Sequence, residues 1–98
     1  MIVEFLDEAE DELTEAALWY DSREPGLGKR FRDDVYHVVR RIGEDPLLWS
    51  EQEGGYRRVN CPVFPYFVAY IIRDSKIVII AMAHAHRLPG YWRSRVNP

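Results

Sequence analysis

The side chains best suited to chemistry stand at the end of an apolar stretch near the C-terminus. Residues 77–83 are almost wholly apolar and rich in β-branched types, which favours a fully buried strand. His84, His86 and Arg87 follow directly. If the extended chain continues through them, the spacing of two places both imidazoles on one face. An imidazole exchanges protons near neutral pH and a guanidinium binds anions, so the strand delivers a candidate reactive site to its own end.

Further basic and aromatic residues would complete this site if the fold brings them to it. Arg58 is expected on a neighbouring strand, from which its guanidinium would clamp a phosphate. Tyr91 and Trp92 follow a Pro-Gly break, where they are either exposed or anchor the tail to the sheet. The full set expected to bind a substrate or target is Arg57, Arg73, Tyr91, Trp92 and Arg93. The alternative is structural: the histidines are polar residues where a strand ends, and Arg57 and Arg58 pair with acids of the first helix.

A zinc site is another interpretation of the histidines. His84 and His86 would bind the ion together with His37 or Cys61, but this spacing lacks a third and a fourth ligand in sequence. We therefore expect no metal and no other cofactor. The single cysteine also excludes a disulfide within the chain.

Two amphipathic helices are predicted in the first half of the chain. Over residues 7–22 apolar side chains recur three and four apart, and Asp7, with Glu10 three positions later, resembles a capping box. A second helix is predicted over residues 26–43, with a stripe formed by Leu27, Phe31, Val35, Val38 and Ile42. The break between them is short, which predicts an antiparallel hairpin of helices.

Strands are predicted on both sides of these helices. Residues 1–6 form a short first strand, 56–61 a second, and 64–72 and 77–83 a hairpin joined through a polar turn. The order β-α-α-β-β-β indicates an α+β fold, with the helical hairpin on one face of a small, mainly antiparallel sheet. Residues 1–98 form a single domain.

Acidic and basic residues are segregated along the chain, whose net charge is −3. Residues 1–24 hold nine acids against one base, about −8, and residues 54–98 hold seven bases against one acid, about +6. One end is therefore a candidate surface for an anionic partner, unless the acidic helix faces the basic strands or solvent. No apolar run approaches the roughly 20 residues that a membrane span needs, so we expect a cytoplasmic protein that does not enter a membrane.

The order of several motifs is more specific than any one of them. An acidic helix containing AALWY at 16–20 leads into PGLGKRF at 25–31. GYRR at 55–58 and FPYFVAY at 64–70 follow, and AHAHRLPGYW stands at 83–92. This succession covers nearly the whole chain and resembles the RelE/ParE superfamily of toxins from type II toxin–antitoxin systems, including plasmid-stabilisation proteins.

The resemblance implies a toxin that stops cell growth and is neutralised by a cognate antitoxin, with which it would form a hetero-oligomer. ParE-like members inhibit DNA gyrase, whereas RelE-like members cleave messenger RNA on the ribosome without a metal. If this chain is a ribonuclease, an imidazole of His84 or His86 acts as acid or base, and Arg58 and Arg87 hold the scissile phosphate. A third alternative is an inactive member that acts only as a protein-binding module.

Departures from the ribonuclease pattern favour gyrase as the target. RNA-cleaving members are strongly basic and usually carry several lysines on the middle strands, whereas this chain is net acidic and has only Lys29 and Lys76. Positive charge on a protein raises its affinity for phosphate-rich targets. The histidine-arginine ending is also common in ParE-type members whose target is unassigned, so the sequence favours a ParE-like inhibitor or a member whose activity is weak or lost.

Overall fold

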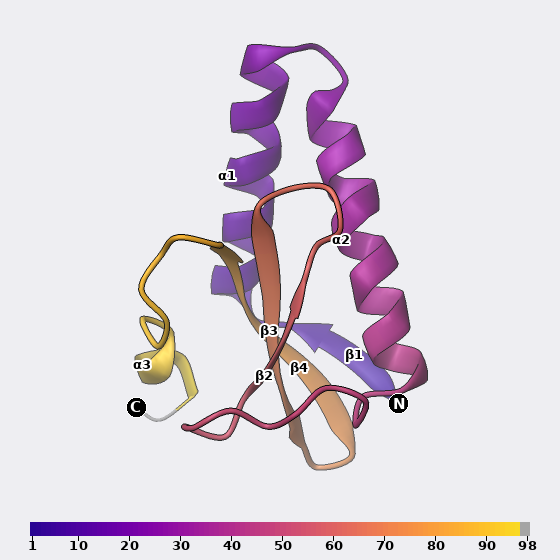
Figure 1. Cartoon of the computed structure of the whole chain (residues 1–98), viewed down its shortest axis with the longest axis vertical. Coiled ribbons are helices and arrows are strands. Elements are labelled where there is room, and N and C mark those ends of the chain that lie inside the picture. Colours follow the sequence, from indigo (N-terminus) through magenta and orange to yellow (C-terminus); the bar gives the residue numbers. More distant parts are fainter. Residues whose placement is uncertain (97–98) are drawn as a thin grey trace.

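The computed structural model describes residues 1–96 and shows helices packed against a sheet (Figure 1). The elements are β1 (Ile2–Phe5), α1 (Asp7–Arg23), α2 (Leu27–Glu44), β2 (Arg57–Asn60), β3 (Tyr66–Arg73), β4 (Lys76–His84) and α3 (Arg93–Val96). Apart from the short α3, this is the predicted order, and it confirms the α+β fold. Among the described residues, no helix is long and apolar enough to cross a membrane.

The sheet has the strand order β1-β4-β3-β2, which makes β4 a central strand as predicted. β1 runs parallel to β4, and the other two pairs are antiparallel. Asp74 and Ser75 join β3 to β4 with φ angles of 52° and 63°. Positive φ at both central residues is typical of a type I′ turn, whose twist matches that of the flanking strands.

A β-bulge interrupts β4 near its middle. Ala81 lies opposite Ala69, but Ile79 lies opposite Tyr70, so Ile80 has no partner residue on β3. β1 pairs with β4 only as far as Ile79. Beyond the bulge, the end of β4 therefore continues without β1 beside it, and other groups can approach its backbone there.

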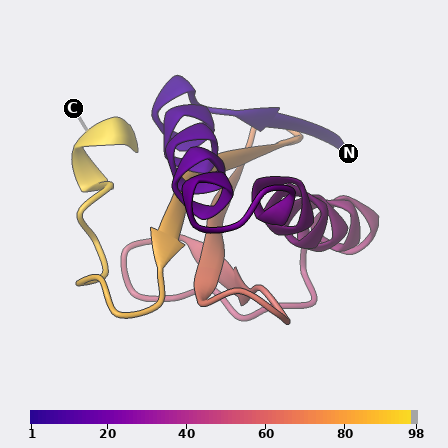
Figure 2. The same ribbon diagram turned by 90° about the horizontal axis from the view of Figure 1, so that it is seen from above.

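α1 and α2 lie side by side on one face of the sheet (Figures 1 and 2). Both predicted stripes are buried, and they share one apolar cluster with the facing side chains of β3 and β4. The helices approach closely at Gly28, where any Cβ would collide with the carbonyl oxygen of Ala17. Glycine is thus required there by packing.

The predicted capping box at the start of α1 is wrong. The N-cap is Leu6, and no side chain caps the first turn. The helix begins at Asp7 as predicted, but its N-cap is Leu6, one residue before the expected cap, and the N–H of Leu6 still donates to the carbonyl of Ile79. Asp7 and Glu10 instead lie in the first turn, where carboxylates suit the positive end of the helix dipole.

The C-terminal segment covers the other face of the sheet (Figure 2). Trp92 is 2% exposed and belongs to a second apolar cluster with Phe67, Ala81 and Ala83. The edge of the Tyr56 ring packs on it, with the ring centroids 5.0 Å apart. Trp92 is therefore an anchor of the tail rather than an exposed residue, which corrects its expected place among the target-binding side chains.

Candidate functional site

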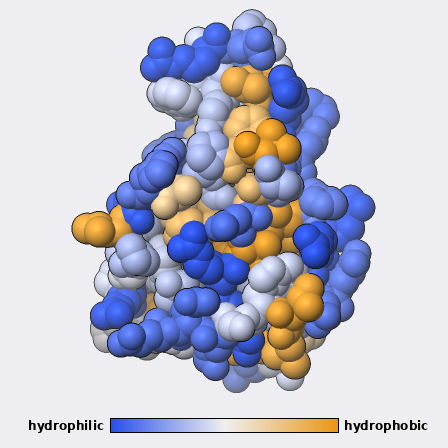
Figure 3. Space-filling model, in the orientation of Figure 1, coloured by the Kyte–Doolittle hydropathy of each residue, from blue (hydrophilic) through white to orange (hydrophobic). Residues whose placement is uncertain are grey.

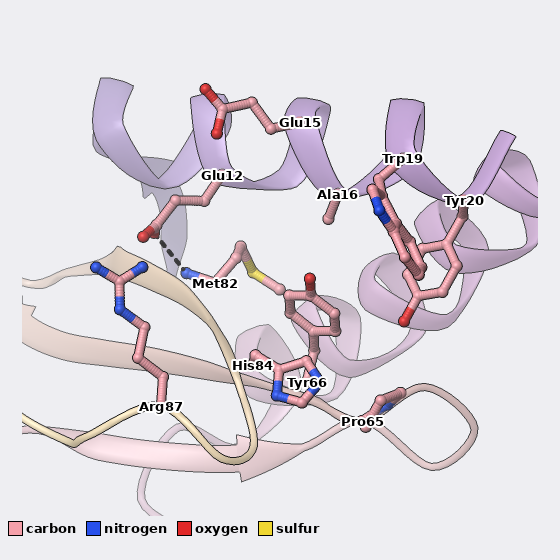
Figure 4. Close-up of a pocket in the computed structure, with 10 residues that line it drawn as sticks. All are labelled: Glu12, Glu15, Ala16, Trp19, Tyr20, Pro65, Tyr66, Met82, His84 and Arg87. Atoms are coloured by element: carbon pink, nitrogen blue, oxygen red, sulfur yellow. Dashed lines mark hydrogen bonds between the residues drawn. The ribbon is translucent and has the colours of Figure 1, made fainter. Parts of the chain in front are cut away.

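A groove of about 740 Å³ lies between α1 and the ends of β3 and β4 (Figure 4). Apolar side chains reach the surface where the helical hairpin projects from the rest of the molecule (Figure 3). The lining comes from one face of α1, the start of β3, the end of β4 and the loop after it: Glu12, Glu15, Ala16, Trp19, Tyr20, Pro65, Tyr66, Met82, His84 and Arg87. The groove thus includes two of the predicted site residues.

The floor of this groove is aromatic. The Tyr66 ring lies edge-on to Tyr20, with centroids 6.3 Å apart, and to His84, with centroids 5.3 Å apart. Trp19 projects from α1 at one end of the groove (Figure 4), and 52% of its surface is exposed. The guanidinium of Arg23 lies 4.6 Å from the centre of the Trp19 ring. An apolar segment could therefore bury large side chains here.

His84, His86 and Arg87 lie in a turn at the end of β4. The N–H of Arg87 donates to the carbonyl of His84 at 3.0 Å, and the N–H of His86 donates to Nδ1 of His84 at 3.2 Å. The two imidazole centroids are 5.4 Å apart. The histidines are thus neighbours as expected, although a turn rather than strand alternation brings them together.

Arg58 lies on the opposite face of the sheet from His84. β3 separates β2 from β4, and Arg58 stands opposite Ala69. Its guanidinium lies 3.7 Å from the centre of the Phe67 ring, in the cluster beneath the tail, whereas His84 packs on Tyr66 on the helix side. The structure therefore does not bring Arg58 together with the histidines.

The other candidates are dispersed. Arg57 donates to the carbonyl of Trp49 at 2.6 Å, Arg73 approaches the carbonyl of Val96 at 3.5 Å, and Arg93 is exposed on α3. Within residues 1–96 neither Arg57 nor Arg58 pairs with an acid of α1, contrary to the structural alternative. In the same part of the chain no three His, Cys, Asp or Glu side chains are placed to hold a metal ion.

Glu12 is the residue that sequence reasoning missed. Its Oε1 accepts from the N–H of Met82 at 3.0 Å and from Arg95 at 2.9 Å. Its Oε2 accepts from the Tyr91 hydroxyl at 2.6 Å and from Arg95 at 3.1 Å. Arg95 also donates to the carbonyl of Ile80, the bulge residue, at 2.9 Å. One carboxylate thus joins α1, the end of β4 and the tail.

A signal for Glu12 was present in the helical spacing. It stands three residues after Ala9 and four before Ala16, both of which are buried, so it faces the sheet rather than solvent. Because other acidic residues surround Glu12 in the sequence, it does not stand out from the exposed acids of the same helix. A carboxylate on the core side of a helix needs donors, and the bases of the C-terminal half are the available ones.

Burial and the Glu12 network set the protonation of several groups. Burial, and then the hydrogen bond to Glu12, raise the pKa of Tyr91 above its ordinary value of 10.0. Burial also raises the pKa of Tyr66, and the hydrogen bond to Glu12 raises that of Arg95. Both phenols therefore keep their protons at physiological pH, and that of Tyr91 is donated to Glu12.

Comparisons with known proteins agree with this geometry. A family model described as "ParE toxin of type II toxin-antitoxin system, parDE" matches residues 3–89. Toxin ParE2 of Mycobacterium tuberculosis, from strains CDC 1551 / Oshkosh and ATCC 25618 / H37Rv, is 28% identical over 89 residues, which cover 90% of this chain and 85% of the relative.

Among solved structures, the chromosomal ParDE TA system from P. aeruginosa has the same fold. The TM-score is 0.78 at 15% identity, over 88% of this chain and 97% of that chain. The family model spans most of the chain, and the resemblance seen in the sequence is confirmed. The chain therefore belongs to the ParE toxin family of type II toxin–antitoxin systems.

Proposed function

We propose that this toxin stops growth by inhibiting DNA gyrase. The observation that carries the proposal is the position of Arg58. RNA cleavage without a metal needs an acid, a base and cations around one phosphate. With Arg58 on the far face of the sheet, the histidines lack that cation. Inhibition by binding needs only an accessible surface, and the exposed loop around Arg87 supplies one.

Inducible expression tests this proposal. Growth should stop without the antitoxin and recover when the antitoxin is co-expressed. The full-length toxin should lower supercoiling by purified gyrase, while messages in arrested cells stay intact. Cleaved messages with normal supercoiling would overturn the proposal in favour of a RelE-like ribonuclease. Normal growth with abundant folded protein would contradict it in favour of an inactive, protein-binding member.

The histidines give a sharper test of the same alternatives. If the target is gyrase, His84→Ala/His86→Ala should remain toxic, with a nearly unchanged melting temperature. If the protein cleaves RNA, losing an acid–base group costs on the order of a hundredfold or more in rate, and toxicity should disappear. His37→Ala is the matched control, because it removes the third histidine from the exposed side of α2.

The antitoxin that the family implies is proposed to occupy the groove beside α1. Trp19, Tyr66 and Met82 offer an apolar floor, on which burial supplies most of the affinity. Arg87 stands at the rim, and within residues 1–96 it has no carboxylate partner. An apolar helix or extended segment with acidic residues at the Arg87 end fits this combination.

Two substitutions on α1 test that location. Trp19→Ala should weaken antitoxin binding tenfold or more, because large aromatic side chains in such grooves dominate binding energy. Leu18→Ala is the control: its side chain is 63% exposed and does not line the groove. Equal effects of the two substitutions, measured by calorimetry on the full chain, would place the antitoxin elsewhere.

A further inference from the structure

We propose that the surface which the C-terminal segment forms over this side of the sheet, with the guanidinium groups of Arg58, Arg87 and Arg93 at it, binds the phosphate backbone of duplex DNA. The inference rests on the proposed function, since DNA is the substrate that gyrase holds, and it adds that the toxin itself contacts that DNA. It is carried by a continuous arrangement of guanidinium groups and rings across this face.

The arrangement begins and ends with an arginine. The Arg58 guanidinium lies 3.7 Å from the centre of the Phe67 ring. Phe67 packs edge-on to Trp92, with centroids 5.8 Å apart, and Trp92 packs on Tyr91 at 5.1 Å. The Arg87 guanidinium lies 3.7 Å from the centre of the Tyr91 ring. Three rings joined by two consecutive contacts therefore support two guanidinium groups, one at each end.

Arg93 adds a third positive charge to this surface. It follows Trp92 directly and is exposed. A Cβ built at Gly54, just before β2, would lie 4.0 Å from its Nη2. Arg93 thus lies on the outer side of the tail, beside the chain that leads into Arg58.

These arginines carry uncompensated charge. Within residues 1–96, Arg95 is paired with Glu12 and Lys76 with Glu4, but no carboxylate lies within 4.0 Å of Arg58, Arg87 or Arg93. A guanidinium that lies over a ring keeps N–H groups at its edge, which suit the oxygens of a phosphate. Arg58 donates through Nη2 to Oδ1 of Asn60 at 3.0 Å, which leaves its other N–H groups for the anion. The side chains are held in position before any anion binds, which lowers the entropy cost of binding.

The burial of the rings favours duplex DNA over a single strand. Phe67 is 1% exposed and Trp92 is 2% exposed. Proteins that bind single strands present open aromatic faces on which bases stack, and these two rings are not accessible for stacking. What remains at the surface is cationic, which matches a backbone and not a base.

Binding of a fluorescent 20-base-pair duplex to the full chain, followed by anisotropy at several salt concentrations, tests this inference. The expected dissociation constant is roughly 10⁻⁴–10⁻⁶ M, as for other non-specific contacts with phosphates. Arg58→Gln/Arg87→Gln should weaken binding about tenfold at low salt and reduce the salt slope by about 0.9 for each lost phosphate contact.

Arg32→Gln/Arg40→Gln is the matched control, because it removes the same charge from α2, on the other side of the sheet. It should leave the affinity within about twofold and keep the full salt slope. Melting temperatures of both variants exclude loss of fold as the cause. Unchanged binding by the Arg58/Arg87 variant, or an equal loss in the control, would overturn the inference. Tighter binding to a 20-nucleotide RNA strand would also overturn it.

Gyrase inhibition is measured on the same wild-type preparation, so the two failures can be told apart. If the toxin lowers supercoiling but does not bind the duplex, the result supports the proposed function and contradicts the inference of DNA binding. A toxin that leaves supercoiling unchanged contradicts the proposed function, whether or not it binds DNA.

Discussion

The two faces of the sheet are covered by different kinds of structure. One face is packed beneath α1 and α2, whose buried side chains recur every three or four residues along long helices. The other is covered by a tail whose only helix in the described part of the chain, α3, has 4 residues. A few specific contacts, from Trp92 and from Glu12, hold this tail.

This difference predicts two levels of stability within one domain. A helix of four residues is not stable alone, so the order of α3 depends on its tertiary contacts. The helix face gains instead from many apolar contacts that form together. We therefore expect the tail to open in local fluctuations at a lower free energy than the helix face, which opens only with the whole molecule.

The largest expected effect is on the helix face. Phe31 is fully buried and packs on Tyr20, Phe64 and Tyr66. Phe31→Ala should lower the free energy of unfolding by about 3–5 kcal/mol, because it removes apolar burial and leaves a cavity. Denaturant titration measures this. Tyr36→Ala, on the exposed side of the same helix, is the control and should change it by less than about 1 kcal/mol.

The next effect is on the tail. Glu12→Ala should cost about 2–3 kcal/mol, because Arg95 and Tyr91 lose a charged partner in a mostly buried setting. Hydrogen exchange should show the loss mainly in the amides of the C-terminal segment. Glu15→Ala removes the next acid of α1, which is exposed, and should leave exchange unchanged. Uniformly faster exchange across both faces in Glu12→Ala would contradict separate levels of stability.

The sequence predicted the helix face well and the tail poorly, for a physical reason. Leu13 and Phe31 belong to stripes of apolar residues whose helical spacing predicts that they are buried. Each stripe can be identified from the residues of its own helix alone. Glu12 binds Tyr91 and Arg95, which stand 79 and 83 positions away. No period in the sequence marks such a pair.

For a related reason, the sequence predicted that His84 and Arg87 lie close together but could not place Arg58. His84 and Arg87 are close in sequence, and local geometry alone brings them to one groove. The place of Arg58 depends on which strand lies between β2 and β4 and on the face that each residue takes. A bulge or a shift of one residue in register reverses that face, and hydrophobic pattern alone does not reveal the bulge at Ile80.

A smaller effect separates the hydroxyl of Tyr91 from the rest of its contacts. Tyr91→Phe keeps the ring beneath Arg87 but loses the hydrogen bond to Glu12, which should cost about 1–2 kcal/mol near pH 7. The folded state holds the phenol proton more tightly than the unfolded state, because the pKa of Tyr91 is raised from 10.0.

The stability from that proton is therefore present below about pH 10 and is lost as the pH rises above it. The difference in unfolding free energy between wild type and Tyr91→Phe should narrow as the pH rises above about 10, toward the raised pKa of the folded state. Denaturant titrations across this range measure it. A difference that is constant with pH would show that burial and the hydrogen bond to Glu12 do not raise the pKa of this hydroxyl in the folded state.

Chemical labelling of a buried cysteine, which needs no further substitution, is the most direct test of the two faces. Cys61 lies in the cluster under the helices, and burial raises the pKa of its thiol to about 12. At pH 8 its reactive thiolate is then roughly a thousandth as abundant as at a thiol of ordinary pKa, so iodoacetamide should react with native protein very slowly. Labelling in 6 M guanidinium gives the reference rate for the open chain.

Because the cysteine reports only on the helix face, Phe31→Ala should accelerate its labelling, whereas Glu12→Ala should open the tail and leave the labelling rate as it is. Equal acceleration by the two substitutions, measured by mass spectrometry, would mean that both faces open together and that the tail has no separate level of stability.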